Sequence, residues 1–322
     1  MRSELDLRLL RAFVAVAEEL HFTRAANRLY VAQQALSRDI RRLESEVGVP
    51  LFVRSTRRVS LTPDGERLLV HARTLLALND AALRDLSGAA RPLLVDVIGE
   101  GLTPARIVDA ARMAAPQLEF TVRYGGGMAA ALAQLDAGRI EVAFGRTEGL
   151  ARRISPELTR RLVRYEPLAL LLPATHPLAA LEEVPCERLR GVEVDASSGN
   201  EDAVEWVDLA GLLLQEFGGR PSPPHAHVVG PNETARHQQA HGLPILTMSE
   251  CPPVAGAVIR PLVEPVPVYP WAMVHRRDVR HPAVTALTGV IRELAASEGW
   301  RRLPEDAWLP GAEAWAPGTP SV

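Results

Sequence analysis

The sequence contains no lysine, so every one of its 36 basic residues is an arginine, which we attribute to genomic base composition rather than to mechanism. Cysteine is also rare, with Cys186 and Cys251 the two in the chain. Two thiols exclude a disulfide framework and indicate a reducing compartment, where an inert thiol is commoner than a redox sensor. No apolar run approaches the roughly 18 residues of a membrane span, and no apolar segment follows the N-terminal charges as in a signal peptide. We therefore expect a cytoplasmic protein without a membrane partner.

The charge of the chain is unevenly distributed. A length of 322 residues suits two or three domains, and a hydrophobic fraction of 47% can fill their cores. The net charge is −3, yet between residues 21 and 62 eight arginines oppose three acidic residues, so this segment carries +5 and the remainder −8. A basic segment on an acidic chain is expected when that segment alone contacts nucleic acid.

Residues 22–42 predict two short helices joined by a tight turn. Thr23 is a residue type that caps helix N-termini, so we expect it to begin the first helix. Ala25 and Ala26 are small enough to let a second helix cross closely. This is the arrangement of a helix-turn-helix.

The second of these helices has one apolar face and one polar face. Leu36, Ile40 and Leu43 recur at helical spacing and are expected to point inward. Gln pairs with adenine, Arg with guanine or phosphate, and Ser with several base edges. The opposite face carries these types, as Gln33, Gln34, Ser37, Arg38, Arg41 and Arg42. The pattern favours a recognition helix in the major groove, although a solvated amphipathic pair shows the same spacing.

A two-stranded wing is predicted after Gly48, which is expected to end the recognition helix. The wing covers residues 52–61 and carries Arg54, Arg57 and Arg58 near its tip. Three arginines beside a helix-turn-helix suit phosphate or minor-groove contacts, and the alternative is a solvent-exposed hairpin.

Residues 5–62 resemble the winged helix-turn-helix DNA-binding domain of LysR-type transcriptional regulators. The matching segments are FTRAA at 22–26, ALSRDI at 35–40, LE at 43–44, GVPLF at 48–52 and LTPDG at 61–65. Ala32 and Gln34 replace the family's usual Ser and Pro, so the helix start loses a cap and the base preference can differ. The DNA contacts expected on this basis are Thr23, Gln33, Gln34, Ser37, Arg38, Arg41, Arg54, Arg57 and Arg58.

Residues 63–87 predict a long linker helix, with Thr62 and Pro63 as its N-cap and first residue. Its leucines lie at near-heptad spacing over about three heptads, which is short for an independent coiled coil. The resemblance implies that this helix pairs antiparallel with that of a second copy. The expected dimer contacts are Leu68, Leu75, Leu76 and Leu83. Residues 88–92 predict a hinge.

From residue 93 onward strands and helices alternate, which predicts parallel α/β sheets. The first set has strands at 93–98, 120–124 and 141–144 and helices at 104–114 and 128–136. The second set has strands at 168–172, 192–194, 227–229 and 244–247 and helices at 204–217 and 233–241. A strand at 271–275 and a helix at 283–296 return to the first set.

These segments resemble the LysR-type effector-binding domain, a two-lobed α/β fold like that of periplasmic binding proteins. The matching segments are LDAGRIEVA at 135–143, LP at 172–173, HPLA at 176–179 and HGLPI at 241–245, where Pro244 replaces a usual Gly. The resemblance implies an effector domain over 93–300. Lobe 1 covers about 93–165 and 268–300, and lobe 2 covers about 166–267. Residues 301–322 form a Pro- and Gly-rich tail outside it.

An effector is expected at the carboxyl ends of the strands, where open α/β sheets bind ligands. The candidate contacts there are Glu100, Thr103, Met128, Arg146, Thr147, Ser197, Ser198 and Thr247. Glu100 is an acid where the family commonly has a small neutral residue, so it can pair with Arg146 or select a cationic or polyol-like ligand. Loop-forming Gly and Ser without a ligand would give a similar pattern.

An enzyme is not indicated. The chain has no Gly-x-Ser-x-Gly elbow, and residues 125–127 lack the Gly-Lys-Ser/Thr of a phosphate loop. His237 and His241 lie four residues apart on a predicted helix, as metal ligands can, but spacing fixes no third ligand. We therefore expect neither a metal nor a cofactor.

The favoured interpretation is a LysR-type regulator that binds double-stranded DNA as a dimer or a dimer of dimers. It would respond to a small-molecule effector, with RNA polymerase as a further candidate partner. One alternative is a two-lobed small-molecule-binding protein with a basic interaction module. Another is a regulator controlled by its abundance or by a partner protein.

Overall fold

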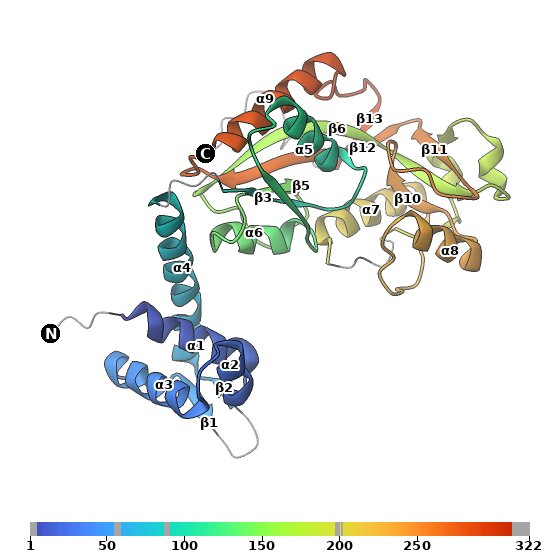
Figure 1. Cartoon of the computed structure of the whole chain (residues 1–322). Coiled ribbons are helices and arrows are strands. Elements are labelled where there is room, and N and C mark those ends of the chain that lie inside the picture. The colour runs from blue at the N-terminus through green and yellow to red at the C-terminus, as the bar shows by residue number, and fades with distance from the viewer. Residues whose placement is uncertain (1–4, 55–58, 87–90, 197–199, 201, 311–322) are drawn as a thin grey trace. The chain divides into compact units, whose positions relative to one another are not determined.

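The computed structural model in Figure 1 describes residues 5–54, 59–86, 91–196, 200 and 202–310. The chain divides into two compact units, of which the smaller is built from the first 89 residues and the larger essentially from residue 90 onward. Among the described helices, none combines the length and apolar character that a membrane span requires.

The first unit is helical with one β-hairpin, as the sequence predicted. Its elements are α1 (Leu7–Glu19), α2 (Phe22–Arg28), α3 (Gln33–Val47), β1 (Phe52–Arg54), β2 (Val59–Leu61) and α4 (Pro63–Leu86). β1 and β2 pair antiparallel, with Phe52 opposite Leu61. Helix α3 ends at Gly48, whose φ of 78° is the left-handed conformation that glycine adopts at little cost.

The core of the first unit lies between α1, α3 and the wing. Leu36, Ile40 and Leu43 of α3 are buried, which confirms the predicted apolar face. Phe13 of α1 is also fully buried, and its ring centroid lies 5.4 Å from that of Phe52 in β1. Burial of each such side chain stabilises the unit by about 1.5–3 kcal/mol, so helix and wing are held by one core.

The start of α4 is fixed by Thr62, as predicted. The Thr62 hydroxyl accepts a hydrogen bond from the N–H of Gly65 at 3.0 Å and donates one to the carbonyl of Pro50 at 2.7 Å. A Cβ at position 65 would collide with the carbonyl oxygen of Leu51. Glycine is therefore required where α4 crosses the chain that enters the wing.

The prediction that Thr23 caps the first helix of the pair is wrong. Helix α2 begins at Phe22, and the ring of His21 accepts the N–H of Arg24 at 3.4 Å. His21 takes the cap because its backbone is extended, whereas Thr23 already lies within the helix. The Thr23 hydroxyl instead donates to the side chain of Gln33 at 3.4 Å, which joins α2 to the start of α3.

The leucines of α4 do not form a single exposed stripe. Leu68 and Leu76 are half-buried against the core of their own unit. Leu75 is 38% exposed and Leu78 is 59% exposed. The side chain of Leu83 lies outside the described residues. The sequence could not make this distinction, because heptad spacing does not show that α1 covers one side of α4.

The second unit is built on a mixed sheet with the described strand order β4-β3-β5-β12-β6-β11-β7, β10 beside β6 and β13 beside β12. The strands are β3 (Leu93–Val97), β4 (Phe120–Tyr124), β5 (Val142–Gly145), β6 (Leu158–Pro173), β7 (Val184–Pro185), β10 (Ile245–Met248), β11 (Ala257–Val263), β12 (Val266–Arg276) and β13 (Ala307–Trp308). A separate short ribbon pairs β8 (Glu193–Val194) with β9 (Arg220–Pro221).

Helices lie on both sides of the first lobe's strands, with α5 and α9 on one side and α6 on the other (Figure 1). The helices are α5 (Thr103–Ala114), α6 (Met128–Asp136), α7 (Val204–Phe217), α8 (Pro231–His241) and α9 (Pro282–Ser297), with short 3₁₀ turns at Pro177–Ala180 and Cys186–Leu189. Each α-helix agrees with its prediction to within two residues, because apolar periodicity and Pro at the helix start marked them clearly.

The predicted two lobes are present, and β6 belongs to both. β12 pairs antiparallel with β6 from Leu158 to Pro167, beside β5 and β3. From Leu168 onward β6 pairs instead with β10 and β11. The change of partners along one continuous strand marks the passage from the first lobe to the second.

Three sequence predictions in this unit are wrong. The sheet is mixed: β3 pairs parallel with β4 and β5, β11 with β7 and β12 with β13, whereas β6 pairs antiparallel with β10, β11 and β12. β6 begins ten residues before the predicted 168, in a segment whose arginines hide the apolar pattern. Residues 227–229 form no strand, and the preceding Pro223 and Pro224 lack the N–H that a ladder needs.

The predicted loose tail starts later than expected. Trp300 is 3% exposed, and its carbonyl accepts the N–H of Tyr165 in β6 at 2.8 Å. Trp308 lies in β13, which pairs with the start of β12, and its ring packs 6.1 Å from that of Phe217 in α7. The tail therefore docks on the unit up to Pro310, and residues 311–322 lie outside the described chain.

Candidate functional site

The first candidate site is the polar face of α3. Gln33, Gln34, Arg38 and Arg41 are exposed and Ser37 is half-buried, which confirms that this face points away from the core. Helix α3 has Ala32 at its N-cap and no side chain that caps it, as the sequence predicted. Its first N–H groups are therefore left for another acceptor, and a helix N-terminus is a favourable place for phosphate.

The arginines near this face differ in what they contact. The guanidinium of Arg42 donates to Glu46 at 2.8 Å, and Arg24 and Arg28 pair with Glu19 and Glu18. Arg38 and Arg41 make no ion pair with any described residue. A guanidinium without an internal partner can bind a guanine edge or a phosphate at no cost in broken contacts.

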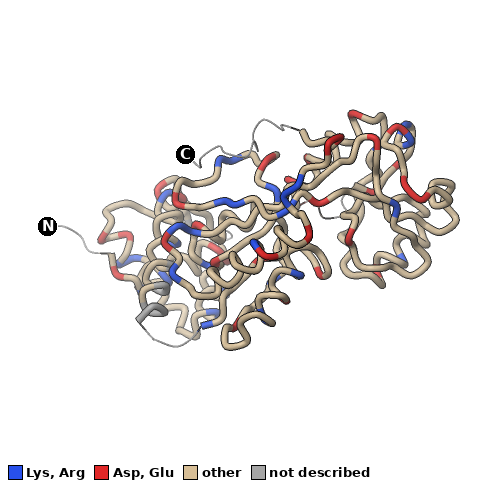
Figure 2. The backbone as a smooth tube through the Cα atoms, turned by 90° about the horizontal axis from the view of Figure 1, so that it is seen from above, with Lys and Arg blue, Asp and Glu red and all other residues tan. Residues whose placement is uncertain are grey.

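The wing is fixed to the same helix by one carboxylate. Glu44 of α3 accepts the N–H groups of Leu51 and Phe52 at 3.0 and 3.2 Å. Arg57 and Arg58 lie outside the described residues, as does the side chain of Arg54. Arginines and acidic residues are interspersed along the described trace (Figure 2).

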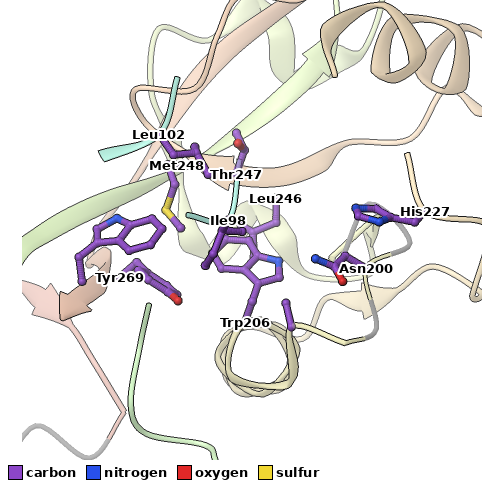
Figure 3. Close-up of a pocket in the computed structure, with 11 residues that line it drawn as sticks. Ile98, Leu102, Asn200, Trp206, His227, Leu246, Thr247, Met248 and Tyr269 are labelled. Atoms are coloured by element: carbon purple, nitrogen blue, oxygen red, sulfur yellow. The ribbon is translucent and has the colours of Figure 1, made fainter. Parts of the chain in front are cut away.

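The second candidate site is a cavity of about 200 Å³ between the lobes of the second unit (Figure 3). Its walls come from the end of β3, the approach to α5, the start of α7, β10 and β12. The lining residues are Ile98, Leu102, Asn200, Ala203, Trp206, His227, Leu246, Thr247, Met248, Tyr269 and Trp271. No charged side chain is among these described residues, and three aromatic side chains form much of the wall.

The aromatic wall is held rigidly. The ring of Tyr269 lies 5.7 Å from that of Trp206 and 4.7 Å from that of Trp271. The Tyr269 hydroxyl accepts the backbone N–H of Arg146 at 2.8 Å, and the indole N–H of Trp271 donates to buried Glu166 at 2.6 Å. These contacts satisfy the polar atoms of Tyr269 and Trp271, so the aromatic rings are the least polar part of the cavity wall.

Of the predicted effector contacts, Thr247 lines the cavity. Thr103 is buried beside it, where its hydroxyl donates to Glu166 at 2.7 Å and accepts from Arg164 at 2.9 Å. Met128 is fully buried in the first lobe, and Thr147 bonds to Glu148. Ser197 and Ser198 lie outside the described residues, and in the sequence they come shortly before Asn200, which lines the cavity.

The predicted pairing of Glu100 with Arg146 is wrong. Arg146 is 3% exposed, and its guanidinium donates to Asp208 at 2.6 Å and to the backbone carbonyl of Glu205 at 2.9 Å, both in α7. Glu100 is exposed and accepts from the Tyr124 hydroxyl at 3.3 Å. Arg146 therefore joins the first lobe to α7, and its guanidinium is buried there.

Sequence reasoning missed the aromatic lining, Trp206, Tyr269 and Trp271. Aromatic residues make up 5% of the chain, so their placement near strand and helix ends was a usable signal. Their convergence depends on how β12 lies beside β6 and α7, which no local pattern specifies.

Family comparisons match both units. Residues 7–66 match the bacterial regulatory helix-turn-helix protein of the lysR family, and residues 94–296 match the LysR substrate binding domain. The chain belongs to the LysR family.

Individual relatives agree with this. The chain is 31% identical over 305 residues to the Hca operon transcriptional activator HcaR of Escherichia coli. The aligned region covers 91% of this chain and 99% of that relative. It is 37% identical over 183 residues to the HTH-type transcriptional regulator BudR of Raoultella terrigena, covering 54% of this chain and 61% of that one. The chain spans 59–62% of the length of three curated relatives that it matches.

Solved LysR-family structures share the fold. Full-length OxyR from Pseudomonas aeruginosa matches with a TM-score of 0.60 at 25% identity, over 90% of this chain and 98% of that one. CbnR matches with a TM-score of 0.65 at 20% identity, over 90% and 99%, which shows the fold alone.

Glu205 is a buried acid next to the cavity between the lobes of this LysR-family chain. It is 0% exposed, and one carboxylate oxygen accepts the N–H of Met128 at 2.8 Å. The other oxygen has no hydrogen-bond partner among the described residues. Burial raises the pKa of the Glu205 carboxyl above its usual range, and the Met128 N–H and Arg146 offset only part of that effect.

The raised pKa predicts a pH dependence of stability. A carboxyl whose folded-state pKa exceeds its unfolded-state value stabilises the fold at low pH, and this contribution is lost as the pH rises through the folded-state pKa. The free energy of unfolding of wild type should therefore fall relative to that of Glu205→Gln as the pH rises from 4.5, the ordinary pKa of a glutamate carboxyl, through the higher folded-state pKa. The fall is about 1.4 kcal/mol for each tenfold difference in the acid dissociation constant between the unfolded and folded states. Urea unfolding measures the free energy of unfolding of both proteins, with Glu100→Gln at an exposed position as the control. A constant difference between wild type and Glu205→Gln across this pH range would contradict the prediction.

Proposed function

We propose that this LysR-family chain is a sequence-specific DNA-binding transcription regulator, acting in the cytoplasm, with α3 in the major groove and the wing along the DNA backbone. One observation carries the proposal: α3 buries Leu36, Ile40 and Leu43 and presents Arg38 and Arg41 to solvent without an ion pair among the described residues. HcaR and BudR are named as transcriptional regulators. We propose no enzymatic activity, since the relatives are regulators.

Arg38 and Arg57 are expected to contribute differently to DNA binding. Arg38→Ala should weaken binding to the operator by about 1–3 kcal/mol with little effect on random DNA, because a bidentate guanine contact is lost. Arg57→Ala, between β1 and β2, should weaken both alike and reduce the salt dependence. Gel shifts on operator and scrambled duplexes measure this. Arg67→Ala is the control, because the guanidinium of Arg67 pairs with Asp64 on α4. If Arg38→Ala bound the operator as tightly as wild type, the placement of α3 in the major groove would be wrong.

We propose that the regulator is a homodimer through α4, or a dimer of dimers, on an interrupted palindrome. Leu75 and Leu78 are the exposed leucines that support this, whereas Leu68 and Leu76 are already used within the unit. Two copies bring two recognition helices to two half-sites, which a single copy cannot do. RNA polymerase is a further partner that regulation of transcription implies.

The α4 interface gives a test that separates assembly from folding. The double variant Leu75→Asp with Leu78→Asp should sediment as a smaller species and lose operator affinity by tenfold or more, roughly 1.4 kcal/mol, while its helix content stays unchanged. Leu76→Asp should instead lower the unfolding temperature, because it places a charge against the core. Val229→Asp, an exposed apolar position in the second unit, is the control. An unchanged mass for the double variant would exclude this face.

We propose that the effector is a small, flat and largely uncharged molecule bound in the cavity between the lobes. An apolar cavity of about 150 Å³ holds benzene, so the 200 Å³ here suits a single ring with one or two polar substituents. Trp206, Tyr269 and Trp271 offer ring faces, and Thr247, Asn200 and His227 offer polar groups. The described lining has no cation, which disfavours highly charged ligands.

Phenol, benzamide and benzoate form a graded probe set for this cavity, and tryptophan fluorescence is the readout. We expect the neutral compounds to bind more tightly than benzoate, and Thr247→Val to weaken the tightest by about 1 kcal/mol. Trp206→Ala should abolish the response while operator affinity is kept, and exposed Thr121→Val is the control. If none binds, control by abundance or by a partner protein becomes the better hypothesis.

A further inference from the structure

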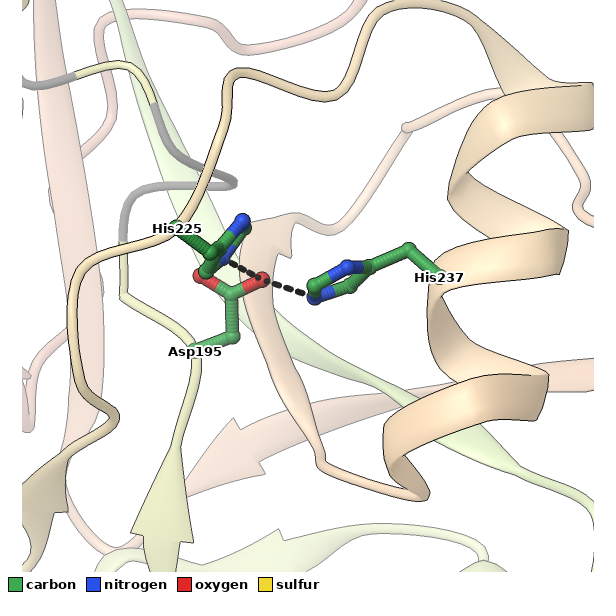
Figure 4. Close-up of side chains that lie close together, drawn as sticks. All are labelled: Asp195, His225 and His237. Atoms are coloured by element: carbon green, nitrogen blue, oxygen red, sulfur yellow. Dashed lines mark ion pairs between the residues drawn. The ribbon is translucent and has the colours of Figure 1, made fainter.

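Three side chains far apart in the sequence converge within the second lobe. Asp195 follows β8, His225 lies in the irregular segment after β9, and His237 lies on α8 (Figure 4). Asp195 Oδ2 lies 3.1 Å from His225 Nε2 and 3.4 Å from His237 Nε2. The three potential ligand atoms all lie within 4.8 Å of one another. Asp195 is 1% exposed, so the group is enclosed by protein on its carboxylate side.

These separations match the edges of a metal coordination shell. Zn²⁺ binds imidazole nitrogen and carboxylate oxygen at about 2.0–2.2 Å, so two ligands of a tetrahedral ion lie about 3.4 Å apart. An aligned hydrogen bond from imidazole to carboxylate would also be short. However, His225 Nε2 and His237 Nε2 are buried and make no hydrogen bond of acceptable geometry among the described residues. Both imidazole nitrogens lie close to the same carboxylate oxygen of Asp195.

The second nitrogen of His225 shows which atom is available to a ligand. His225 Nδ1 lies 2.9 Å from the carbonyl oxygen of Ala226, so Nδ1 carries the hydrogen and donates it. In the neutral ring Nε2 then holds a lone pair, which faces the carboxylate of Asp195. A metal cation between these two electron-rich atoms would be attracted to both. A backbone carbonyl that orients the distal ring nitrogen is the usual support of a metal-bound histidine.

The two imidazoles lie side by side. Their rings stack with centroids 4.1 Å apart. His241, one turn further along α8, packs against His237 with the two rings tilted and their centroids 4.6 Å apart, but it lies outside the group of three ligand atoms.

We propose that Asp195, His225 and His237 form a binding site for one divalent first-row transition metal ion of the zinc type. Two imidazoles and one carboxylate are the donor set of such ions, whereas Mg²⁺ and Ca²⁺ prefer oxygen ligands alone. Three protein ligands leave a fourth position for water or an anion. The site is separate from DNA recognition and from the proposed effector contacts.

The site shares its supports with the effector cavity. The carbonyl of Asp195 accepts the N–H of Leu246 at 2.9 Å, and Leu246 lines the cavity. His227, two residues beyond His225, lines it as well. Residues 222–229 have no regular secondary structure, so a metal bond at His225 would fix this part of the cavity wall to β8 and α8.

Titration of the full-length, tag-free protein with Zn²⁺ after removal of chelator tests the proposal. Calorimetry should show one Zn²⁺ per chain, no heat with Mg²⁺, and a rise in unfolding temperature with Zn²⁺. His225→Gln and His237→Gln should each weaken Zn²⁺ binding by roughly a hundredfold. His241→Gln, which removes a neighbouring imidazole outside the group, should bind like wild type. Co²⁺ in place of Zn²⁺ should give visible absorption bands of a low-coordinate site that both ligand variants lose.

Circular dichroism and operator binding without metal establish that each variant is folded. Zn²⁺ affinity unchanged in the double variant His225→Gln with His237→Gln, or lost equally in His241→Gln, would overturn the assignment. Absence of any one-to-one Zn²⁺ binding to wild type would also overturn it. None of these outcomes bears on DNA recognition, which Arg38→Ala tests independently.

Discussion

The backbone ladder between β6 and β12 is the constraint on which the second unit depends. β6 pairs with β12 up to Pro167 and with β10 and β11 from Leu168 onward, and β12 pairs on its other side with β5. Because β6 is one continuous strand, the lobes share one sheet and one buried cluster that contains Val163, Leu168 and Trp271. The cavity therefore lies on a rigid base, with its variable walls contributed by loops and by α7.

Buried polar groups hold that base in place. Glu166 is fully buried between the Thr103 hydroxyl and the Trp271 indole, with the Arg164 guanidinium nearby. Burial raises the pKa of the Glu166 carboxyl, and Arg164 and the two hydrogen bonds counteract this in part. Removing one partner from such a network costs more than any surface pair contributes, because the remaining groups stay buried. The network fixes the side chains behind the cavity rather than serving a ligand.

Local patterns predicted the helices, the wing and the domain order, because each depends on neighbouring residues. The apolar face of α3 and the Thr62 cap are examples. Local patterns failed where a residue distant in the sequence decides what a side chain contacts. Arg146 pairs with α7 instead of Glu100, and Leu76 is covered by its own unit. The three residues proposed here as metal ligands could not be connected by spacing, because β8, the segment at 222–229 and α8 meet only in three dimensions.

The docked C-terminal segment changes the mechanics of the effector domain. Besides β6 and β12, the chain passes from one lobe to the other once more, between α9 and β13, where Trp308 packs on Phe217 of α7. Two strands alone would act as an open hinge, about which the lobes could twist. A third crossing anchored by an aromatic pair resists twisting and leaves small closing motions as the softest deformation. Signals from the cavity would then be transmitted as short displacements of stiff elements, and truncation before Ala307 would loosen the coupling while leaving the cavity intact.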